Sequence, residues 1–330
     1  MLSYLRNYLY KKDKPKIYSS KKKLFLQKKI RNYKKKYYII KRNRWHGMFS
    51  NLHYVLSHLI LAKKNKYKPI IDMENFPTIY NEKKRIDDSF NSWHYYFKKF
   101  TKKNINSIYK NNNFIYSDSS NLDTSKIKKN EYSQYKKILK NDLIKNKIIK
   151  KAERFENKFF KNKKVLGIHL RGSDQKKAAL HPFPPTYTQV EAVLKKIQIK
   201  NKFDIIYLVT EEKKYVSKFK SKLGNKLICF PSFRSNHDIF SIYPRKNHRY
   251  LLGLETIINM ILLSKVDHLI HSNTNFSAMA NHFSNKKIKQ TIIFNGYNSK
   301  NIFLANMLWY LKSILPSFLG GFKTRITNIK

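Results

Sequence analysis

Apolar positions divide the first half of the chain into short runs and amphipathic segments. Between residues 52 and 62 the apolar side chains recur at spacings of three and four, which predicts a helix. β-rich runs at 37–41 and 69–72 flank this helix, and a glycine turn precedes it. Strand, turn, helix and strand in this order open a Rossmann-like unit. A longer apolar stripe between Lys runs predicts a second helix over 132–160.

The second half alternates more regularly. The predicted strands lie at 165–170, 203–209, 226–230, 267–271 and 290–294, and the predicted helices at 190–197, 212–223, 251–264 and 275–283. Gly224 stands where the second of these helices would end, at a C-cap position. This repeated alternation predicts a parallel sheet with helices on both faces, so the fold class is α/β with two Rossmann-like domains.

We place the boundary between the two domains at the end of the long helix. Residues 1–36 then form a basic N-terminal arm, and 37–160 form the first Rossmann-like domain. Residues 161–300 form the second domain. We expect 301–330 to be a terminal helix that crosses back to the first domain.

The charge of the chain raises the question of its partners. Seventy Lys and Arg against twenty Asp and Glu give a formal net charge of +50. Only eleven of the basic residues are Arg, and the Lys excess accompanies abundant Asn, Ile and Tyr, as biased codon usage on solvated faces would produce. A nucleic-acid-binding protein would concentrate Arg for bidentate contacts. Nucleic-acid binding therefore stays an alternative, and Lys also suits a peripheral contact with an anionic membrane.

Other features narrow the class of protein further. Cys229 is the single cysteine, so an internal disulfide and a Cys-based zinc site are excluded. No run of eighteen apolar residues predicts a membrane span, and 1–36 lacks the apolar segment of a signal peptide. We therefore expect a cytoplasmic protein, at most peripheral to the inner face of a membrane.

The first candidate for chemistry follows the first strand of the second half. His169 and Arg171 alternate with Leu170 and so point to one side of the strand. A guanidinium at a strand end suits a diphosphate, and Gly172 leaves room for backbone to approach its oxygens. The competing interpretation is a surface ion pair between Arg171 and Asp174.

The second candidate is a polar stretch between a predicted strand and a predicted helix. Ser272, Thr274 and Asn275 place hydroxyl and amide groups at a helix N-terminus, which attracts anions. The competing interpretation is an ordinary N-cap, where Ser, Thr and Asn are preferred in any case.

Several motifs, taken together with their order and spacing along the chain, resemble those of the GDP-fucose-dependent fucosyltransferases. The likeness is closest to the α-1,6 and nodulation-type enzymes and their bacterial relatives. The resemblance spans about residues 40–295. The motifs that carry it are His169-x-Arg171-x-x-Asp174, Leu262-Leu263-Ser264-Lys265-Val266-Asp267 with Asn273-Thr274-Asn275-Phe276-Ser277, Tyr207-Leu208-Val209-Thr210-Glu211, and Gly47-x-x-x-Asn51.

The resemblance implies a GT-B-like fold, in which two Rossmann-like domains face each other across a cleft, and a GDP-fucose donor held mainly by the C-terminal domain. It implies that Arg171 binds the β-phosphate, that His169 lies by the nucleotide, and that the loop with Ser272 and Thr274 completes the phosphate contacts. The remaining donor-site residues by this likeness are Gly172, Gly47, Asn51, Thr210, Asn259 and Asn275.

The sequence departs from the family pattern at three positions. Gly172 stands where a second Arg is frequent, and Glu211 stands where the middle motif has Asp. Asn259 replaces an Asp that, by family likeness, reads guanine, and Glu255 lies one helical turn away as a substitute. A catalytically inactive, sugar-binding family member therefore stays an alternative.

The expected reaction is inverting transfer of fucose to a glycan acceptor in surface polysaccharide or oligosaccharide synthesis, without a metal. The chain contains no Asp-x-Asp motif, and Arg171 with a helix N-terminus offers a metal-free way to stabilise the leaving diphosphate. His181, in a Pro-rich loop, is a candidate general base for the acceptor hydroxyl, and Asp174 and Asp238 are its rivals.

Overall fold

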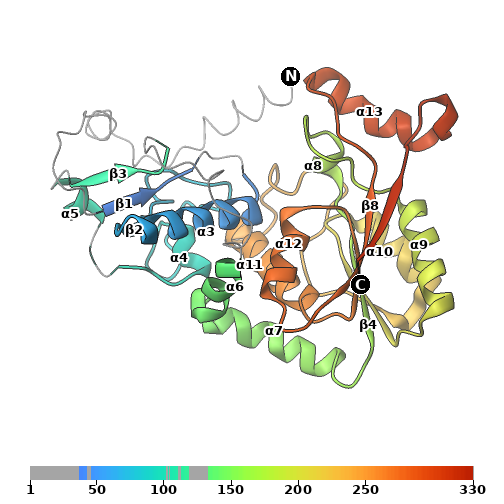
Figure 1. Cartoon of the computed structure of the whole chain (residues 1–330), viewed down its shortest axis with the longest axis horizontal. Coiled ribbons are helices and arrows are strands. Elements are labelled where there is room, and N and C mark those ends of the chain that lie inside the picture. Colours follow the sequence, from blue (N-terminus) through green and yellow to red (C-terminus); the bar gives the residue numbers. More distant parts are fainter. Residues whose placement is uncertain are drawn as a thin grey trace. The chain divides into compact units, whose positions relative to one another are not determined.

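The computed structural model describes residues 37–42, 46–101, 103, 105–110, 113–118 and 133–329 (Figure 1). The basic arm expected at 1–36 lies outside these residues. Contacts group the chain into two compact units. Unit 1 extends to Ile138 and includes Tyr243–Tyr250, and unit 2 comprises Leu139–Ile242 and the residues from Leu251 onward. This division precedes the boundary expected at residue 160, so the helix that ends there belongs to unit 2.

Unit 1 contains a three-stranded parallel sheet in the order β2-β1-β3. The strands are β1 (Tyr37–Ile40), β2 (Lys68–Ile71) and β3 (Phe114–Tyr116), and the helices are α3 (Met48–Lys64), α4 (Trp93–Tyr96), α5 (Ile105–Lys110) and α6 (Ser133–Ile138). The predicted apolar stripe of α3 is buried, including Leu52, Val55 and Leu56. The aromatic cluster of α4 is also core, since Trp93 and Tyr96 are buried.

Unit 2 contains a six-stranded sheet in the order β6-β5-β4-β7-β8-β9. Its first five strands are parallel, and β9 pairs antiparallel with β8. The strands are β4 (Val165–His169), β5 (Ile205–Val209), β6 (Leu227–Ile228), β7 (His268–His271), β8 (Lys289–Phe294) and β9 (Arg325–Ile329). The helices are α7 (Asn146–Phe159), α8 (Ser173–Lys176), α9 (Tyr187–Lys200), α10 (Lys213–Leu223), α11 (His248–Leu263), α12 (Asn275–Phe283) and α13 (Ile302–Ile314). The first three residues of α11 group with unit 1, and the rest of this helix belongs to unit 2.

Strand alternation assigns each side chain of the sheet in unit 2 to one of two helical layers. On one face, Leu166 and Ile168 pack in a core with α9 and α10. On the other face, a Cβ at Gly167 would lie only 2.8 Å from the Leu263 side chain of α11, so glycine permits this helix to approach. Leu170 continues the first face, as the alternation predicts, and this leaves His169 and Arg171 on the opposite side.

The helix predicted over 132–160 is broken. Between α6 and α7 the chain forms a π-helical turn, Leu139–Leu143, and α7 begins at Asn146. The buried positions Leu139, Leu143, Ile148 and Ala152 are spaced by four, five and four residues. Because this spacing exceeds 3.6 residues per turn, a continuous α-helix would rotate them off one face, and the wider turn and the break restore their alignment.

The C-terminal segment groups with unit 2. After α13 the chain forms a 3-10 turn, η5 (Ser317–Leu319), and then β9, which extends the sheet of unit 2 at its edge beside β8. A hydrogen bond from the Thr291 hydroxyl to Asn328 Oδ1 (2.8 Å) ties this edge strand to its neighbour. Within the described ranges, no helix is both long enough and apolar enough to cross a membrane.

Candidate functional site

Residues predicted to carry the chemistry lie at the carboxyl edge of the sheet in unit 2. From β4 the strand order proceeds to β5 and β6 on one side and to β7 and β8 on the other, so β4 and β7 flank a topological switch point. Open parallel sheets bind ligands at the carboxyl ends of the strands at such a point. His169 pairs in register with His271 across these two strands. The Arg171 and Ser272 stretches therefore leave the sheet side by side.

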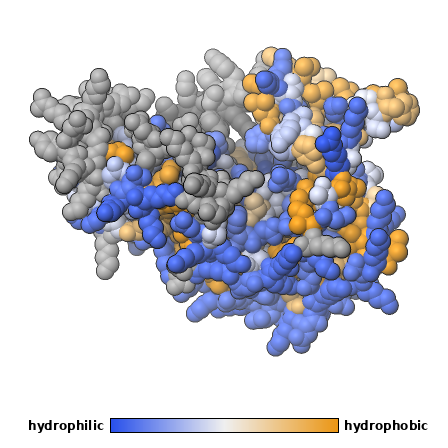
Figure 2. Space-filling model, viewed as in Figure 1, coloured by the Kyte–Doolittle hydropathy of each residue, from blue (hydrophilic) through white to orange (hydrophobic). Residues whose placement is uncertain are grey.

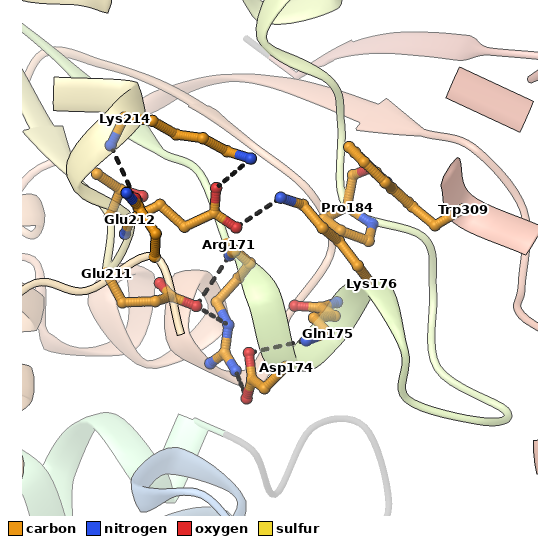
Figure 3. A network of polar contacts seen from close by, with 12 residues as sticks. Arg171, Asp174, Gln175, Lys176, Pro184, Glu211, Glu212, Lys214 and Trp309 are labelled. Atoms are coloured by element: carbon orange, nitrogen blue, oxygen red, sulfur yellow. Dashed lines mark hydrogen bonds and ion pairs between the residues drawn. The ribbon is translucent and has the colours of Figure 1, made fainter. Parts of the chain in front are cut away.

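Arg171 lies between two carboxylates. Its Nη2 donates to Asp174 Oδ2 at 2.6 Å, and its Nε is 3.5 Å from Glu211 Oε1 (Figure 3). The same Glu211 oxygen accepts the backbone N–H of Gly172 at 2.8 Å. The ion pair with Asp174, which the competing interpretation expects, is thus present. The Arg171 side chain is nevertheless 32% exposed, so a ligand can reach the guanidinium.

The two carboxylates are affected differently by the shared guanidinium. Desolvation raises the pKa of Glu211, and the nearby charge of Asp174 adds to this, although Arg171 opposes it. For Asp174, desolvation acts in the same direction, but the charge and hydrogen bond of Arg171 outweigh it and lower the pKa. Asp174 is therefore the ionised partner that orients Arg171, and Glu211 is the carboxyl that more readily holds a proton.

The space beside Gly172 is filled by protein. A Cβ at this position would lie 2.5 Å from Glu212 Cγ and 2.8 Å from its Oε1. The sequence suggested that Gly172 leaves room for ligand oxygens to meet the backbone. In the structure the missing side chain makes room for Glu212.

Glu212 in turn belongs to a buried charge pair with Lys176. Lys176 Nζ lies 2.5 Å from Glu212 Oε1, and both side chains are only 2% exposed. The same ammonium lies over the rings of Trp309 (4.5 Å) and Tyr215 (4.9 Å). Trp309 Nε1 donates to the Pro184 carbonyl at 2.8 Å. This network, drawn in Figure 3, connects α8, α10 and α13 and fixes the segment that follows Arg171.

His169 and Ser272 present buried polar atoms with unused hydrogen-bonding capacity. His169 stacks on Phe276 of α12 (4.2 Å between centroids), and burial, followed by the charges of Arg171 and His271, holds its pKa well below the ordinary value. The ring is therefore neutral. In the described part of the chain, neither His169 Nδ1 nor Ser272 Oγ has a hydrogen-bond partner. Buried polar atoms are normally paired, so both atoms are candidates for contact with a ligand.

Thr274 and Asn275 occupy the N-terminus of α12. Thr274 is its N-cap, and its hydroxyl accepts the Ser277 N–H at 3.3 Å in a reciprocal capping box. The competing interpretation as an N-cap is therefore the role that Thr274 has in the structure. Asn275 is the exposed first residue of the helix.

The remaining donor-site residues of unit 2 make structural contacts. The Thr210 hydroxyl accepts the Glu212 N–H at 3.3 Å. Asn259 accepts from the Tyr207 hydroxyl (2.7 Å) and donates to the Ser232 hydroxyl and to the Glu255 carbonyl. Its amide is thus engaged at both ends. Glu255 accepts the backbone N–H of Phe233 at 3.0 Å.

The glycine loop predicted in unit 1 forms the start of α3. Gly47 is the N-cap, with φ −66°, and a Cβ there would find no atom within 4 Å. Asn51 donates to the His46 carbonyl at 3.0 Å, while its buried Oδ1 has no hydrogen-bond partner among the described residues. The open space beside Gly47 and the unused Asn51 oxygen are both compatible with a ligand at this loop.

The candidate bases lie in loops of unit 2. His181 is exposed, and its backbone pairs with the loop before α13 through the Asn298 N–H (2.9 Å). Among the described residues no contact joins its ring to the Arg171 network. Asp238 accepts the Phe240 N–H at 3.1 Å in its own turn.

Sequence reasoning anticipated the contact of Arg171 with Asp174 but missed that Glu211 also contacts Arg171 and that Glu212 pairs with Lys176. Glu211 and Glu212 follow Thr210 after the end of β5, which neighbours β4, so their position at the same edge was the available signal. The Lys176–Glu212 pair carried no signal, because Lys is abundant everywhere in the chain. Within the described ranges, no three His, Cys, Asp or Glu side chains gather in an arrangement that could hold a metal ion.

Comparisons with known proteins place the fold. No protein-family model matches the sequence, and the search of curated proteins gives no significant match. Among solved structures, NodZ α-1,6-fucosyltransferase co-crystallised with GDP is 14% identical, with a TM-score of 0.52 over 78% of this chain and 95% of that one. The same enzyme soaked with GDP-fucose is 13% identical, with a TM-score of 0.52 and the same coverage.

A third structure is selenomethionyl NodZ from Bradyrhizobium, which is 14% identical, with a TM-score of 0.51 over 78% of this chain and 94% of that one. At these identities the likeness shows the fold alone. The chain has the fold of these fucosyltransferases, which confirms the predicted α/β, GT-B-like class. The resemblance first seen in the motifs thus extends to the fold.

Proposed function

We propose that this chain is a metal-independent, inverting glycosyltransferase that transfers fucose from GDP-fucose to a glycan acceptor. The observation that carries the proposal is the strand-end guanidinium of Arg171, a third exposed and held by Asp174 and Glu211. It lies at the switch point of a sheet whose fold is shared with NodZ, an enzyme co-crystallised with GDP and soaked with GDP-fucose. The motifs of the sequence support the same assignment.

In the proposed reaction the acceptor hydroxyl attacks the anomeric carbon of fucose from the face opposite to GDP. The new glycosidic bond forms as the bond to the diphosphate oxygen breaks, and the hydroxyl proton passes to a base, for which we propose His181. Negative charge develops on the departing diphosphate. Arg171, with the Ser272 hydroxyl and the N-terminus of α12, stabilises that charge without a cation.

Asp174 serves this reaction by orienting Arg171 rather than by accepting the proton. Its pKa is lowered by the guanidinium, despite the opposing effect of desolvation, which makes it a weak base. The neutral His169 ring adds no positive charge, and its Nδ1 can exchange a hydrogen bond with the nucleotide. In unit 1, we propose that Gly47 and Asn51 also contact the donor or acceptor.

A thermal-shift panel of GDP, UDP, CDP and ADP tests the donor assignment. A ligand at 100 times its Kd stabilises the native state by about 2.7 kcal/mol, so GDP at saturating concentration should raise the melting temperature by several degrees. The other nucleotides at equal concentration should raise it less. An equal shift with all four would remove guanine from the proposal, because the site would then not distinguish the bases.

A transfer assay tests the reaction itself. We expect GDP release from GDP-fucose in the presence of a glycan acceptor, with the same rate in EDTA as in Mn²⁺. Activity that EDTA abolishes and Mn²⁺ restores would contradict the metal-free mechanism, and complete absence of transfer with retained GDP binding would favour the inactive, sugar-binding alternative.

The net charge of +50 keeps nucleic-acid binding as a second candidate function. A nucleic-acid-binding protein would lose affinity steeply as salt rises, because phosphate contacts release counterions. Such binding would also be indifferent to substitution of Arg171 alone. Filter binding of duplex and single-stranded oligonucleotides at two salt concentrations, with and without Arg171→Ala, separates the two functions.

A further inference from the structure

An exposed apolar face covers the C-terminal helix of unit 2. Ten of the eighteen large hydrophobic side chains that are exposed in the described residues lie between Ile302 and Leu319. Phe303, Met307, Leu311 and Ile314 follow one another at helical spacing, so they form a single stripe along α13. Figure 2 shows the same concentration of hydrophobic residues over the α13 end of unit 2. A patch of this size marks an interaction site.

The inner side of α13 is firmly attached to unit 2. Ala305 and Trp309 are its buried residues, and the Asn298 amide donates to the Ala305 carbonyl at 3.0 Å. Trp309 packs against Lys176 and donates to Pro184, as described above. Because the opposite side of the helix carries the apolar stripe, the exposure of the stripe is a fixed property of the packed helix.

The turn after α13 extends this face and is itself well defined. Phe318 is 84% exposed in η5. A Cβ at Gly321 would lie 2.0 Å from the Leu315 carbonyl oxygen, and the Gly321 N–H donates to the Pro316 carbonyl at 3.0 Å. Only glycine permits this close return of the chain. The turn therefore holds Phe318 outward by its backbone geometry.

The charge around the face identifies its partner. Residues 301–322 contain no Asp or Glu and only one Lys, Lys312, which donates to the Gly320 carbonyl at 2.9 Å. Lys300, Lys323 and Arg325 flank the apolar segment. An apolar surface without carboxylates, bordered by cations, matches the interface of an anionic bilayer, where acyl chains lie beneath negative headgroups.

We propose that the outer face of α13 and η5 docks unit 2 on an anionic lipid surface. The helix lies in the plane of the interface, because thirteen residues span about 20 Å, less than the roughly 30 Å of a hydrocarbon core. A second copy of the chain is a poorer occupant, since it would bring another +50 charges to the same place. The proposal is independent of the transferase activity.

Vesicle sedimentation of the full chain tests the proposal. We compare phosphatidylcholine vesicles with vesicles that contain a third phosphatidylglycerol, and expect binding to the second kind only. The double variant Phe303→Gln with Ile314→Gln should bind at least about tenfold more weakly, because two large apolar side chains no longer enter the interface. A matched control replaces Phe100 and Ile199, exposed apolar residues elsewhere, with Gln, and should bind as the parent does.

Three results would overturn the proposal. They are absence of binding to the anionic vesicles, equal binding by the α13 double variant, and equal loss in the matched control. The second would show that the Lys-rich surface alone binds lipid, and the third that the loss is not specific to the outer face of α13 and η5. Sedimentation equilibrium identifies a second copy as occupant if the double variant halves the mass of the parent. Should the double variant fail to fold, the variant Phe318→Trp replaces it. We then expect brominated phosphatidylglycerol in the vesicles to quench the fluorescence of this tryptophan. Unchanged fluorescence would contradict the proposal.

Discussion

In both units a loop with buried polar groups leaves the carboxyl end of a parallel strand. In unit 1 that loop starts at Asp72, directly after β2, and the carboxylate is fully buried. It accepts the N–H groups of Glu74 and Asn75, the side-chain amide of Asn75 and the Tyr109 hydroxyl. In unit 2 the loop after β4 holds Arg171, which is partly exposed and shared by two carboxylates.

The two loops differ in how many of their buried polar atoms remain without a hydrogen-bond partner. Every donor around Asp72 belongs to the fold of unit 1, so this carboxylate closes its own loop. At the edge of unit 2, His169 Nδ1 and Ser272 Oγ are buried without partners in the described part of the chain. Polar residues at a strand end therefore do not mark a ligand site by themselves. Unused capacity beside an accessible charge is the further feature on which we base the proposed donor site.

The largest expected effect concerns the buried Lys176–Glu212 pair, which fixes the segment that follows Arg171. Lys176→Met leaves Glu212 buried without its close partner and should lower the free energy of unfolding by about 3–5 kcal/mol. Denaturant titration measures this loss. Lys214→Met is the matched control, because Lys214 is 3.6 Å from the same carboxylate but half exposed, and it should cost under about 1 kcal/mol. Similar losses in the two variants would show that the buried pair is not the support.

Arg171→Ala should separate binding chemistry from stability. If Arg171 stabilises the departing diphosphate, kcat/KM for fucosyl transfer falls by about 10²–10³, equivalent to about 2.7–4 kcal/mol. The melting temperature should change little, since partly exposed ion pairs contribute about 1 kcal/mol or less. Arg154→Ala, on the exposed side of α7, should leave both quantities unchanged. Undiminished transfer by Arg171→Ala would refute the assignment of the site.

The periodicity of apolar residues predicted the strands and helices well where the tertiary contacts agree with that periodicity. The five parallel strands of unit 2 and the helix end at Gly224, with φ +52°, lie where the pattern places them. β3 and β9 were missed, since one has three residues and the other is an exposed edge strand whose pairing with β8 depends on tertiary contacts. The break before α7 was missed because a stripe with slightly wide spacing still resembles a helix.

The candidate site was predictable in its location but only partly in its contacts. The alternation of His169, Leu170 and Arg171 fixed which side chains share a face. It could not show that Glu212 fills the space beside Gly172, because that contact joins two loops 40 residues apart. Nor could it show that the Asn259 amide is occupied by Tyr207, a contact between a strand and a helix.

Acid should weaken unit 1 through His58. Burial, with the charge of Arg42 as a second cause, lowers its pKa to about 4 from 6.5, and its Nδ1 lies 2.6 Å from the Tyr38 hydroxyl. The unfolded chain therefore binds the proton more readily. The stabilisation is complete above pH 6.5 and is lost as pH falls toward 4, by about 3 kcal/mol. His58→Gln should have a shallower decline in melting temperature over this range, and an identical pH profile would contradict the assignment.

The smallest effects distinguish two glycines that both stand at helix N-caps. Gly172→Ser should destabilise unit 2 by about 1–3 kcal/mol, because its Cβ meets the side chain of Glu212, which Lys176 holds in place. Gly47→Ser has open space and a favourable capping hydroxyl, so the stability of unit 1 should be unchanged or rise by up to about 1 kcal/mol. Differential scanning calorimetry compares the two variants.

The same pair tests whether unit 1 has a ligand loop like that of unit 2. If a substrate approaches the backbone at Gly47, the serine side chain obstructs it, and transfer by Gly47→Ser falls although stability does not. Full activity in that variant would show that no substrate approaches the backbone at Gly47. Asn51 Oδ1 would then have no proposed ligand, and the substrate contacts would lie at other residues. A stability loss equal to that of Gly172→Ser would instead show that the space beside Gly47 is filled, and would remove the distinction between the two loops.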